Sequence, residues 1–402
     1  MNTSLLHEIA ERVGTPCYVY DADRIRANYH ALASAFPGAG KPVIHFAVKA
    51  NGNLSVLRLL RELGAGFDVV SGGEMHRALR AGARPESIVF AGVGKTDAEL
   101  VDALAHGIGW INVESAQELR VLSDLAVAHG RVQRVALRLN PGVDPHTHDY
   151  MSTGKSGTKF GVEPATALDL IARRRAFPGV AIEGVHFHIG SMVFEPEPYL
   201  AALDVALDVI TRARAMGAEV DSLDMGGGFG IPYTADQVAA PVAAMAAALL
   251  PRIRAAQIDL HLEPGRFLVA DAGVLLTRVL YTKQSGGTDY VIVDAAMNDL
   301  IRPALYGATH QPAPLDPPTT TERRAVELVG PVCESGDFLA HSASLPPLTR
   351  GQLLTIANAG AYGMSMASNY NTRPRGAEVM VEGGAWRVIR PRETLDHLMA
   401  GE

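Results

Sequence analysis

The sequence VIHFAVKANGN, residues 43–53, joins an apolar run to a group of small and amide residues, and Lys49 stands at the junction. The β-branched and aromatic residues of the run predict a strand that ends near Val48. At the mouth of an apolar pocket, burial disfavours a charged ammonium group and frees the amine to form a Schiff base with an aldehyde. The alternative is a lysine whose stem packs along the strand end while its amine stays in water.

Short β-type runs of this kind recur through the first two thirds of the chain. They span residues 43–48, 66–70, 87–91, 110–113, 135–140, 182–188, 222–225 and 258–262. Segments with helical apolar spacing, such as Leu54, Leu57, Leu60 and Leu63, separate them. Eight strand–helix units in series predict an α/β fold, a parallel (β/α)8 barrel of the TIM type.

A doubly wound open sheet also alternates strands with helices. Its dinucleotide fingerprint is incomplete here, because Ile231 fills the last glycine position of the run that begins at Gly226. Gly94-Lys95-Thr96 fails as a P-loop, because Val89 replaces the first glycine. The barrel is therefore the preferred prediction.

Past about Ala270 the strand patterns follow one another without long helices. They cover residues 274–281, 290–294, 325–329, 352–357, 378–382 and 386–389, which predicts an all-β domain of the barrel or sandwich type. The proline-rich stretch 310–321 is expected to be a loop. We expect a barrel domain over residues 22–270 and a β domain made of residues 1–21 and 271–402.

The composition excludes several classes of protein. A hydrophobic fraction of 48%, a charged fraction of 20% and a net charge of -7 indicate a globular protein with no basic face for nucleic acid. The longest apolar run, residues 239–250, is too short for a membrane span and predicts a buried helix. With no export signal and only Cys17 and Cys333, a cytoplasmic protein without disulfides is expected.

Polar residues follow several of the predicted barrel strands, where barrels of this kind carry their chemistry. Lys49 follows the first strand, Asp68 ends the second, and His188 ends the sixth. The run Gly226–Gly230 follows the seventh strand, and the segment from Glu263 to Arg266 follows the eighth. A glycine run there brings backbone amides onto a phosphate group, and Arg266 adds a positive charge.

The histidines at the end of the sixth strand allow two interpretations. His186 and His188 share one face of a strand, as half of a metal site would, but no cysteine or further histidine stands at ligand spacing, so no metal is predicted. A flat imidazole over a flat cofactor ring suits His188 better. Glu263 beside an aromatic nitrogen would keep that nitrogen protonated, and with Lys49 and the phosphate cradle it indicates pyridoxal 5'-phosphate.

Longer motifs make a resemblance specific. AVKAN, GFDVVSGGE, HFHIGS, DMGGGFGIPY, EPGRF, RPALY, GPVCESGDFLA and AYGMSMASNYNTRPR closely resemble the diaminopimelate decarboxylases, which belong to the alanine-racemase-like fold class of pyridoxal phosphate enzymes. The resemblance covers nearly the whole chain. It implies decarboxylation of meso-2,6-diaminopimelate to L-lysine and CO2, the last step of lysine biosynthesis.

The resemblance also assigns residues. It implies that Lys49 holds the cofactor covalently, that His188 stacks on its ring, that Glu263 pairs with its nitrogen and that Asp68 supports the lysine. The phosphate would be surrounded by Ser191, Gly226, Gly227, Gly228, Gly265, Arg266 and Tyr362, and the substrate would be bound by Arg266, Arg302, Tyr306, Glu334 and Tyr362. Cys333 would return a proton to the α-carbon. Cys333 and Glu334 would reach the partner subunit's site, which implies a homodimer with shared active sites.

One departure from the family keeps other substrates open. Met192 follows HIGS where the family usually has glutamine, so D-lysine, D-ornithine or a carboxylated polyamine is an alternative substrate. An alanine racemase would share the fold, but Cys333, Glu334 and Arg302 favour decarboxylation. A non-catalytic homologue that binds the cofactor is disfavoured, because both Lys49 and Cys333 are present.

Overall fold

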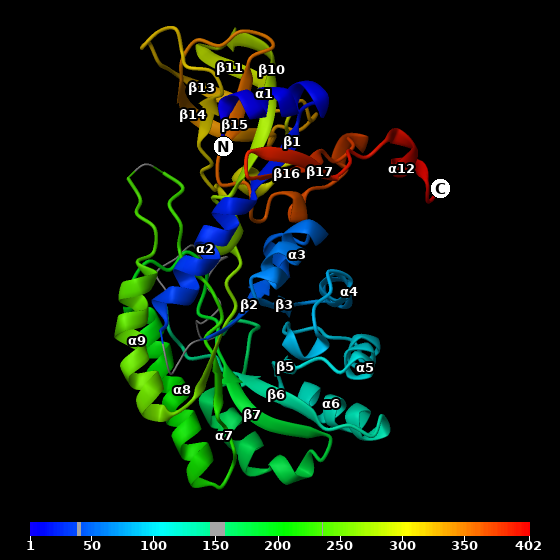
Figure 1. Ribbon diagram of the computed structural model, residues 1–402, viewed down its shortest axis with the longest axis vertical. Helices are drawn as coiled ribbons and strands as arrows, with labels where there is room; N and C mark the ends of the chain where they lie inside the picture. Colours follow the sequence, from blue (N-terminus) through cyan, green and yellow to red (C-terminus); the bar gives the residue numbers. More distant parts are fainter. Residues whose placement is uncertain (38–41, 145–156, 235) are drawn as a thin grey trace. The chain divides into compact units, whose positions relative to one another are not determined.

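The computed structural model describes residues 1–37, 42–144, 157–234 and 236–402. Contacts along the chain divide it into two compact units (Figure 1). One unit, named here the barrel unit, comprises Asn28–Gly230 and Ala239–Phe267. The other, named the β unit, comprises Met1–Ala27, Ile231–Val238 and Leu268–Glu402.

Eight parallel strands form a closed barrel in the barrel unit, because the first of them, β2, also pairs with the last, β9. The strands are β2 (Val43–Ala47), β3 (Gly66–Val69), β4 (Ile88–Phe90), β5 (Trp110–Val113), β6 (Gln133–Arg138), β7 (Val180–His186), β8 (Ser222–Asp224) and β9 (Asp259–Leu262). The predicted parallel barrel is confirmed, and each strand lies within a few residues of its predicted bounds.

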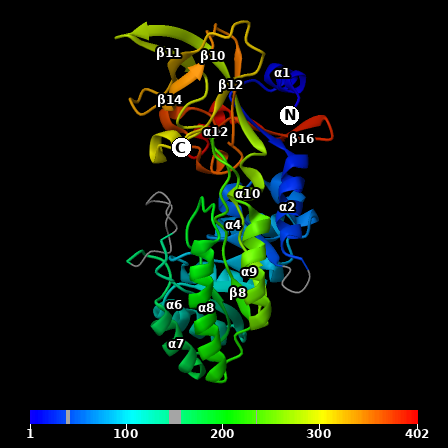
Figure 2. The ribbon, with the colours of Figure 1, turned by 90° about the vertical axis from the view of Figure 1, so that its left-hand side faces the viewer.

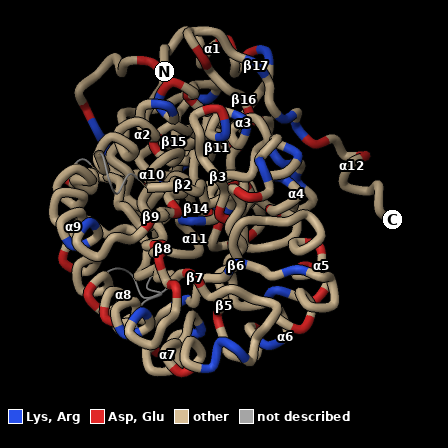
Figure 3. The backbone as a smooth tube through the Cα atoms, turned by 60° about the horizontal axis from the view of Figure 1, so that its bottom comes forward, with Lys and Arg blue, Asp and Glu red and all other residues tan. Residues whose placement is uncertain are grey.

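Helices follow the strands around the outside of the ring, and many of the charged residues mark their outward sides (Figure 3). They are α3 (Leu54–Glu62), α4 (Gly72–Arg80), α5 (Asp97–His106), α6 (Ala116–Ala128), α7 (Pro164–Ala172), α8 (Glu197–Ala215) and α9 (Val242–Ala256). Side-chain caps at Asn53, Ser71, Thr96 and Ser115 start four of these helices. The caps fix the strand-to-helix turns, which is where the polar strand ends lie.

Helices α8 and α9 pack side by side (Figure 2). The predicted buried helix over residues 239–250 corresponds to α9, which begins after Pro241 and continues through Pro251 to Ala256. The buried side chains Met245, Leu249 and Ile253 form one face on both sides of the proline, so packing overrides the helix-breaking tendency of Pro251. None of the described helices is long and apolar enough to cross a membrane.

The β unit is built on a sheet whose main path runs in the order β14-β13-β11-β10-β1-β16-β17. Its strands are β1 (Cys17–Asp21), β10 (Gly273–Ser285), β11 (Thr288–Val293), β12 (Pro312–Pro314), β13 (Arg324–Val329), β14 (Phe338–Leu345), β15 (Leu353–Ile356), β16 (Ala377–Glu382) and β17 (Ala385–Arg390). Strand β1 lies between β10, to which it is antiparallel, and β16, to which it is parallel (Figure 1). The predicted all-β architecture of this part of the chain is confirmed.

The remaining helices and 3-10 turns complete the chain. They are α1 (Thr3–Arg12), α2 (Ala22–Ala35), α10 (Arg266–Val269), α11 (Arg302–Tyr306), α12 (Leu395–Met399) and the 3-10 turns η1 (Val48–Ala50), η2 (Pro85–Ser87), η4 (Arg174–Ala176), η5 (Met364–Met366) and η6 (Tyr370–Thr372). Leu6, Ile9 and Ala10 of α1 pack with Val19 of β1 and Leu276 of β10 in one buried apolar cluster. Helix α1 therefore covers part of the sheet and keeps its apolar face from water.

Two strands of the β unit differ from the sequence prediction. Residues 310–321 were expected to be a loop, but Pro312–Pro314 pair with β15 as the short strand β12. A proline can occupy such a short strand because its carbonyl can still accept a hydrogen bond, although the residue has no backbone N–H to donate. Strand β14 was not predicted, because its sequence FLAHSASL is rich in small and polar residues.

Candidate active site

Lys49 lies in the 3-10 turn η1, directly after strand β2. Its Nζ donates a hydrogen bond of 2.8 Å to Oδ2 of Asp68, which belongs to the adjacent strand β3. The lysine side chain keeps 39% of its surface exposed, whereas that of Asp68 is fully buried. The buried carboxylate therefore orients an amine that remains open to a small molecule.

Glu263 follows strand β9 and is buried. Asn112 donates from Nδ2 to one of its carboxylate oxygens at 3.1 Å, and Nε2 of His186 lies 3.2 Å from the other. Burial alone would raise the pKa of Glu263, but His186 and Lys49 outweigh it and hold the pKa well below its usual range. The end of the barrel thus contains a buried, ionised carboxylate.

His188 lies two residues beyond strand β7, and its Nδ1 accepts a hydrogen bond of 3.3 Å from the backbone N–H of Gly227. Burial, together with the positive charges of Lys49 and Arg138, lowers the pKa of His188 to about 3. The imidazole is therefore neutral at physiological pH. A neutral, flat ring can lie against an aromatic cofactor without adding charge to it.

The turn after strand β8 packs its backbone closely against its neighbours. Gly226 has a φ of +64°, and a Cβ atom there would lie 2.8 Å from Nδ1 of His188. At Gly227 a Cβ would lie only 2.2 Å from the carbonyl oxygen of Glu263. Since real Cβ atoms do not approach so closely, only glycine fits these positions.

Arg266 and Ser191 add a polar pair beside this turn. The Arg266 guanidinium is mostly buried and donates from Nε and Nη2 to Oγ of Ser191, at 3.3 and 3.2 Å. Val193, two residues after Ser191, donates its N–H to the carbonyl oxygen of Gly228. A guanidinium, a hydroxyl group and a glycine turn in one place have the chemistry of an anion site.

These residues fit pyridoxal phosphate, which requires an amine, a carboxylate for its ring nitrogen and an anion site for its phosphate. Two further observations support the fit. Oδ1 of Asp68 and Nδ1 of His186 are buried polar atoms with no hydrogen-bond partner among the described residues. Such atoms commonly mark the place of a ligand or water that the protein is built to receive.

Among the residues that the structure describes, His186, Asp224 and Glu263 form a buried group whose potential metal-ligand atoms all lie within 4.8 Å of one another. The sequence analysis considered His186 as half of a metal site with His188. The structure instead joins His186 to two carboxyl groups, while His188 contacts the glycine turn.

Gly265 lies in the barrel unit, between strand β9 and helix α10, and the remaining predicted residues belong to the β unit. Arg302 is buried, and its Nη1 lies 3.1 Å from the hydroxyl oxygen of Tyr233 and 2.9 Å from Nε2 of His310. Tyr306 ends the same helix, α11. Tyr362 has a left-handed backbone with a φ of +57°.

Cys333 and Glu334 lie exposed in the connection between strands β13 and β14. The backbone N–H of Cys333 donates to Oδ1 of Asn371 at 2.8 Å, and the Tyr370 hydroxyl lies 3.5 Å from Oε2 of Glu334. The η6 turn of the SNYNT motif therefore holds this connection in place. An exposed thiol beside an exposed carboxylate is accessible to a second molecule.

Sequence reasoning missed two residues of the cluster around Glu263. Asn112 and Asp224 are polar residues inside barrel strands, buried with 1% and 5% of their surfaces exposed. Asn112 stands in an otherwise apolar strand, which is a signal that could have been read, whereas strand β8 also contains Ser222. The contact with Glu263, which lies far away in sequence, depends on the closed barrel.

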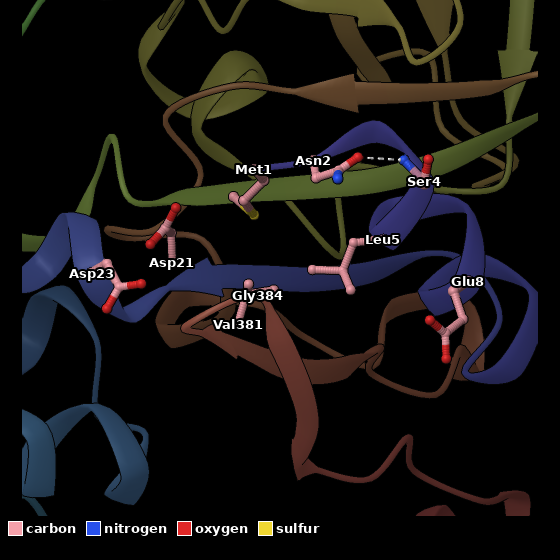
Figure 4. A pocket seen from close by; sticks show the side chains of 9 residues that line it. All are labelled: Met1, Asn2, Ser4, Leu5, Glu8, Asp21, Asp23, Val381 and Gly384. Atoms are coloured by element: carbon pink, nitrogen blue, oxygen red, sulfur yellow. Dashed lines mark hydrogen bonds between the residues drawn. The ribbon is translucent and has the colours of Figure 1, made fainter.

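The β unit also has a hollow of about 350 Å³ that the catalytic prediction does not include (Figure 4). Its acidic residues Glu8, Asp21 and Asp23 point in different directions (Figure 4). Glu8 pairs with Arg12, and Asp23 pairs with Arg26. Because partners already neutralise two of these carboxylates, we assign no ligand to this hollow.

Comparisons with known proteins agree with this geometry. The family model described as "Pyridoxal-dependent decarboxylase, pyridoxal binding domain" matches residues 22–270. The chain is 47% identical over 399 residues to diaminopimelate decarboxylase from Pseudomonas aeruginosa, covering 99% of this chain and 95% of the relative. The corresponding enzyme of Aquifex aeolicus is 44% identical over 399 residues, with 98% and 93% covered.

Solved structures give the same result. A diaminopimelate decarboxylase from Helicobacter pylori, complexed with L-lysine, superposes with a TM-score of 0.94 at 40% identity and covers 98% of both chains. A lysine/ornithine decarboxylase from Vibrio vulnificus, complexed with putrescine, has a TM-score of 0.82 at 26% identity, with 94% of this chain and 98% of that one covered. Sequence similarity is thus higher to the former than to the latter.

Proposed function

Because the chain belongs to the diaminopimelate decarboxylase family of pyridoxal-dependent decarboxylases, we propose that it converts meso-2,6-diaminopimelate to L-lysine and CO2. The observation that carries the proposal is the cluster of Lys49, Asp68 and Glu263 at the polar end of the barrel. Similarity over nearly the full length of both chains supports the substrate. The reaction would complete lysine biosynthesis.

The cofactor is pyridoxal phosphate, which supplies an electron-accepting ring for the pair left behind when CO2 departs. Lys49 would hold the cofactor through Nζ, with Asp68 orienting the amine. Glu263 would accept the ring nitrogen's hydrogen bond, and the neutral His188 would lie on the ring. The phosphate group would be held by Ser191, Gly226, Gly227, Gly228, Gly265, Arg266 and Tyr362.

Residues of the β unit would recognise the substrate. Diaminopimelate carries an ammonium and a carboxylate at the end that does not react, so its recognition calls for both a cation and an anion. Arg302 would bind the distal carboxylate and Glu334 the distal ammonium group. Tyr306 and Tyr362 of the β unit, with Arg266 of the barrel unit, would complete the set of substrate contacts.

Cys333 would donate the proton that replaces CO2 at the α-carbon. A thiol suits this role because it can serve as a general acid, and Cys333 is exposed. The exposed Cys333 and Glu334 would reach the active site of the partner subunit in a homodimer. Each active site would then combine the barrel domain of one chain, residues 22–270, with the β domain of its partner, residues 1–21 and 271–402.

Mixing two inactive variants tests the shared site. Lys49→Ala and Cys333→Ala subunits, unfolded together and refolded, would form hybrid dimers in half of the molecules, each with one intact site. Recovery to roughly one quarter of the wild-type rate is expected if subunits pair at random. No recovery, with hybrid dimers present, would mean that each chain supplies its own thiol.

We place the reaction in the cytoplasm. Both cysteines are free, and the proposed proton donor requires a reduced thiol. In an oxidising medium outside the cell, the Cys333 thiol could be oxidised and could then no longer donate a proton. Fractionation of cells, with the activity followed in each fraction, tests the location.

A CO2-release assay on the cofactor-loaded protein tests the function. The substrates are meso-diaminopimelate and both enantiomers of lysine, ornithine and arginine, and the product is identified by chromatography. Strong preference for meso-diaminopimelate with L-lysine as product is expected. Release only from a D-diamino monocarboxylate would keep the proposed mechanism but change the substrate. Met192, whose backbone φ is +67°, would then be the first residue to test for a role in substrate choice.

A further inference from the structure

Asp224 is the last residue of strand β8, and its Cα lies opposite that of His186 in the ladder. One carboxylate oxygen of Asp224 and one of Glu263 lie within 4.8 Å of each other, and both side chains are buried. The backbone N–H of Gly226 donates to Oδ1 of Asp224 at 2.8 Å.

Two buried carboxyl groups this close are not both ionised, because two negative charges repel each other strongly away from water, and a proton on one group allows it to donate a hydrogen bond to the other. The surroundings decide which group carries it. Glu263 faces the Asn112 amide and His186, while Asp224 receives one backbone N–H. Donors stabilise a carboxylate, so the negative charge belongs on Glu263 and the proton on Asp224.

The other groups that face Asp224 lead to the same result. A small internal cavity, with room for about one water molecule, borders Asp224, Asn112, Ser222 and His261. Burial and the neighbouring His45 lower the pKa of His261 to about 3, so this ring is neutral and does not stabilise an ionised Asp224. Burial and the negative charge of Glu263, with a further contribution from Asp68, raise the pKa of Asp224 well above its usual value.

We propose that Asp224 is a positioning residue that stays protonated and donates a hydrogen bond to Glu263, which fixes the ionised Glu263 carboxylate for the cofactor's ring nitrogen. If the proton moved to Glu263, the negative charge would pass to Asp224, which has fewer hydrogen-bond donors around it to stabilise a carboxylate. The assignment of the ring nitrogen as the target rests on the proposed function. The proton shared by the two carboxyl groups is a property of the protein without cofactor, so the two ideas can fail separately.

An asparagine at position 224 separates a protonated acid from a carboxylate. Its amide oxygen can accept from Gly226 and its N–H can donate to Glu263, as the protonated acid does. If Asp224 were ionised, asparagine would remove a charge and change the direction of the bond. Asp224→Ala removes both bonds in either case.

The first measurement is infrared spectroscopy of the cofactor-free protein at pH 8. The spectrum of the wild type minus that of Asp224→Asn should show the carbonyl stretch of one protonated carboxylic acid. Asp299→Asn is the matched control, since burial raises the pKa of Asp299 to about 7, and its acid band should be present at pH 6 and largely lost at pH 8. Absence of an Asp224 band at pH 8 would overturn the proposal.

The second measurement is the affinity for pyridoxal phosphate, followed by the visible absorbance of the bound cofactor. Asp224→Asn should keep the affinity within about twofold, and Asp224→Ala should weaken it about tenfold or more, the usual loss for a buried hydrogen bond. Equal losses in both variants, or no loss in either, would overturn the proposal. So would stoichiometric metal in the purified wild type that disappears in Asp224→Asn.

The proposed function can be wrong while the proposal for Asp224 is right, and the two outcomes can be told apart. A wild type that retains the acid band and binds the cofactor, but releases no CO2 from diaminopimelate, would remove the proposed function and leave the Asp224–Glu263 pair intact. An active enzyme that lacks the acid band would support the proposed function and overturn the proposal for Asp224. Asp224→Asn is close in size to aspartate, so its folding is a minor concern, and circular dichroism checks it.

Discussion

The Lys49 amine, from the turn after strand β2, and the Asp68 carboxylate of the adjacent strand β3 meet at 2.8 Å, yet only the lysine is open to solvent. A fully buried carboxylate has few ways to move, so it holds the amine at one place at the end of the barrel. The flexible lysine stem, which would otherwise adopt many rotamers, is restricted before any ligand arrives.

Replacing Lys49 with alanine should therefore abolish both turnover and the visible absorbance of the protein-bound cofactor, because the nucleophilic amine is gone. The measurement is an absorption spectrum after incubation with pyridoxal phosphate and removal of the free cofactor. Lys283→Ala, an exposed lysine of strand β10, is the control and should retain the band. An unchanged band in Lys49→Ala would exclude Lys49 from this role.

Gly227 should tolerate no side chain, because a Cβ there would lie 2.2 Å from the carbonyl oxygen of Glu263. Gly227→Ala should lower the free energy of unfolding by about 1–3 kcal/mol and weaken cofactor binding, since the turn must move. Denaturant titration and cofactor titration measure the two effects. Gly94→Ala is the matched control, because a Cβ at Gly94 meets nothing within 4 Å; equal effects of both substitutions would contradict the role of the turn.

Cys333→Ala should lower kcat by about a hundredfold or more while the cofactor stays bound, since loss of a general acid slows proton transfer. Cys17 is the other cysteine, and it is buried in the core of the β unit. Cys17→Ala should reduce stability and leave kcat nearly unchanged. Steady-state kinetics with a spectral measure of bound cofactor separates the two variants, and a wild-type rate in Cys333→Ala would point to another donor.

Glu334→Gln should raise the KM for meso-diaminopimelate by about tenfold or more, because the substrate's distal ammonium group loses a charged partner. The affinity for pyridoxal phosphate should not change. Glu322→Gln, an exposed carboxylate of the same unit that pairs with Arg324, is the control. Equal losses of substrate and cofactor affinity in Glu334→Gln would assign Glu334 a structural role instead.

Asp299 predicts a pH dependence of stability. Burial raises its pKa to about 7, so the folded protein holds a proton that the unfolded chain releases near pH 4. Stability should therefore fall as the pH rises from about 4 to about 7 and then level off, with a total effect of up to about 4 kcal/mol. Asp299→Asn should reduce this decline and be more stable than the wild type at pH 8, as measured by denaturant titration; an unchanged slope would mean that other groups cause it.

The barrel was predictable because its strands are short β-branched runs separated by helical spacing. The strand ends then placed Lys49, Asp68 and Glu263 at the same end of the barrel, in agreement with the structure. Their assembly into one cluster with Asn112 and Asp224 was not predictable. It depends on the register of strands that are distant in sequence and on closure between β2 and β9.

The β unit was less accessible to such reasoning. Strand β14 is formed by small and polar residues, and only its pairing with β13 makes it a strand. No spacing rule could have indicated that Asn371 would support Cys333, since the contact joins a loop to a turn. Roles for Arg302, Tyr306, Glu334 and Tyr362 came from resemblance alone, and they remain predictions.

The position of β1 in the sheet has a consequence for how the protein is made. This strand leaves the ribosome before any of the barrel, but its partners β10 and β16 emerge only after the barrel is complete. Until then its apolar residues have no sheet to join, so they are open to contact with other chains. The barrel can fold before the later strands are made, whereas the β unit must wait until β16 has been synthesised.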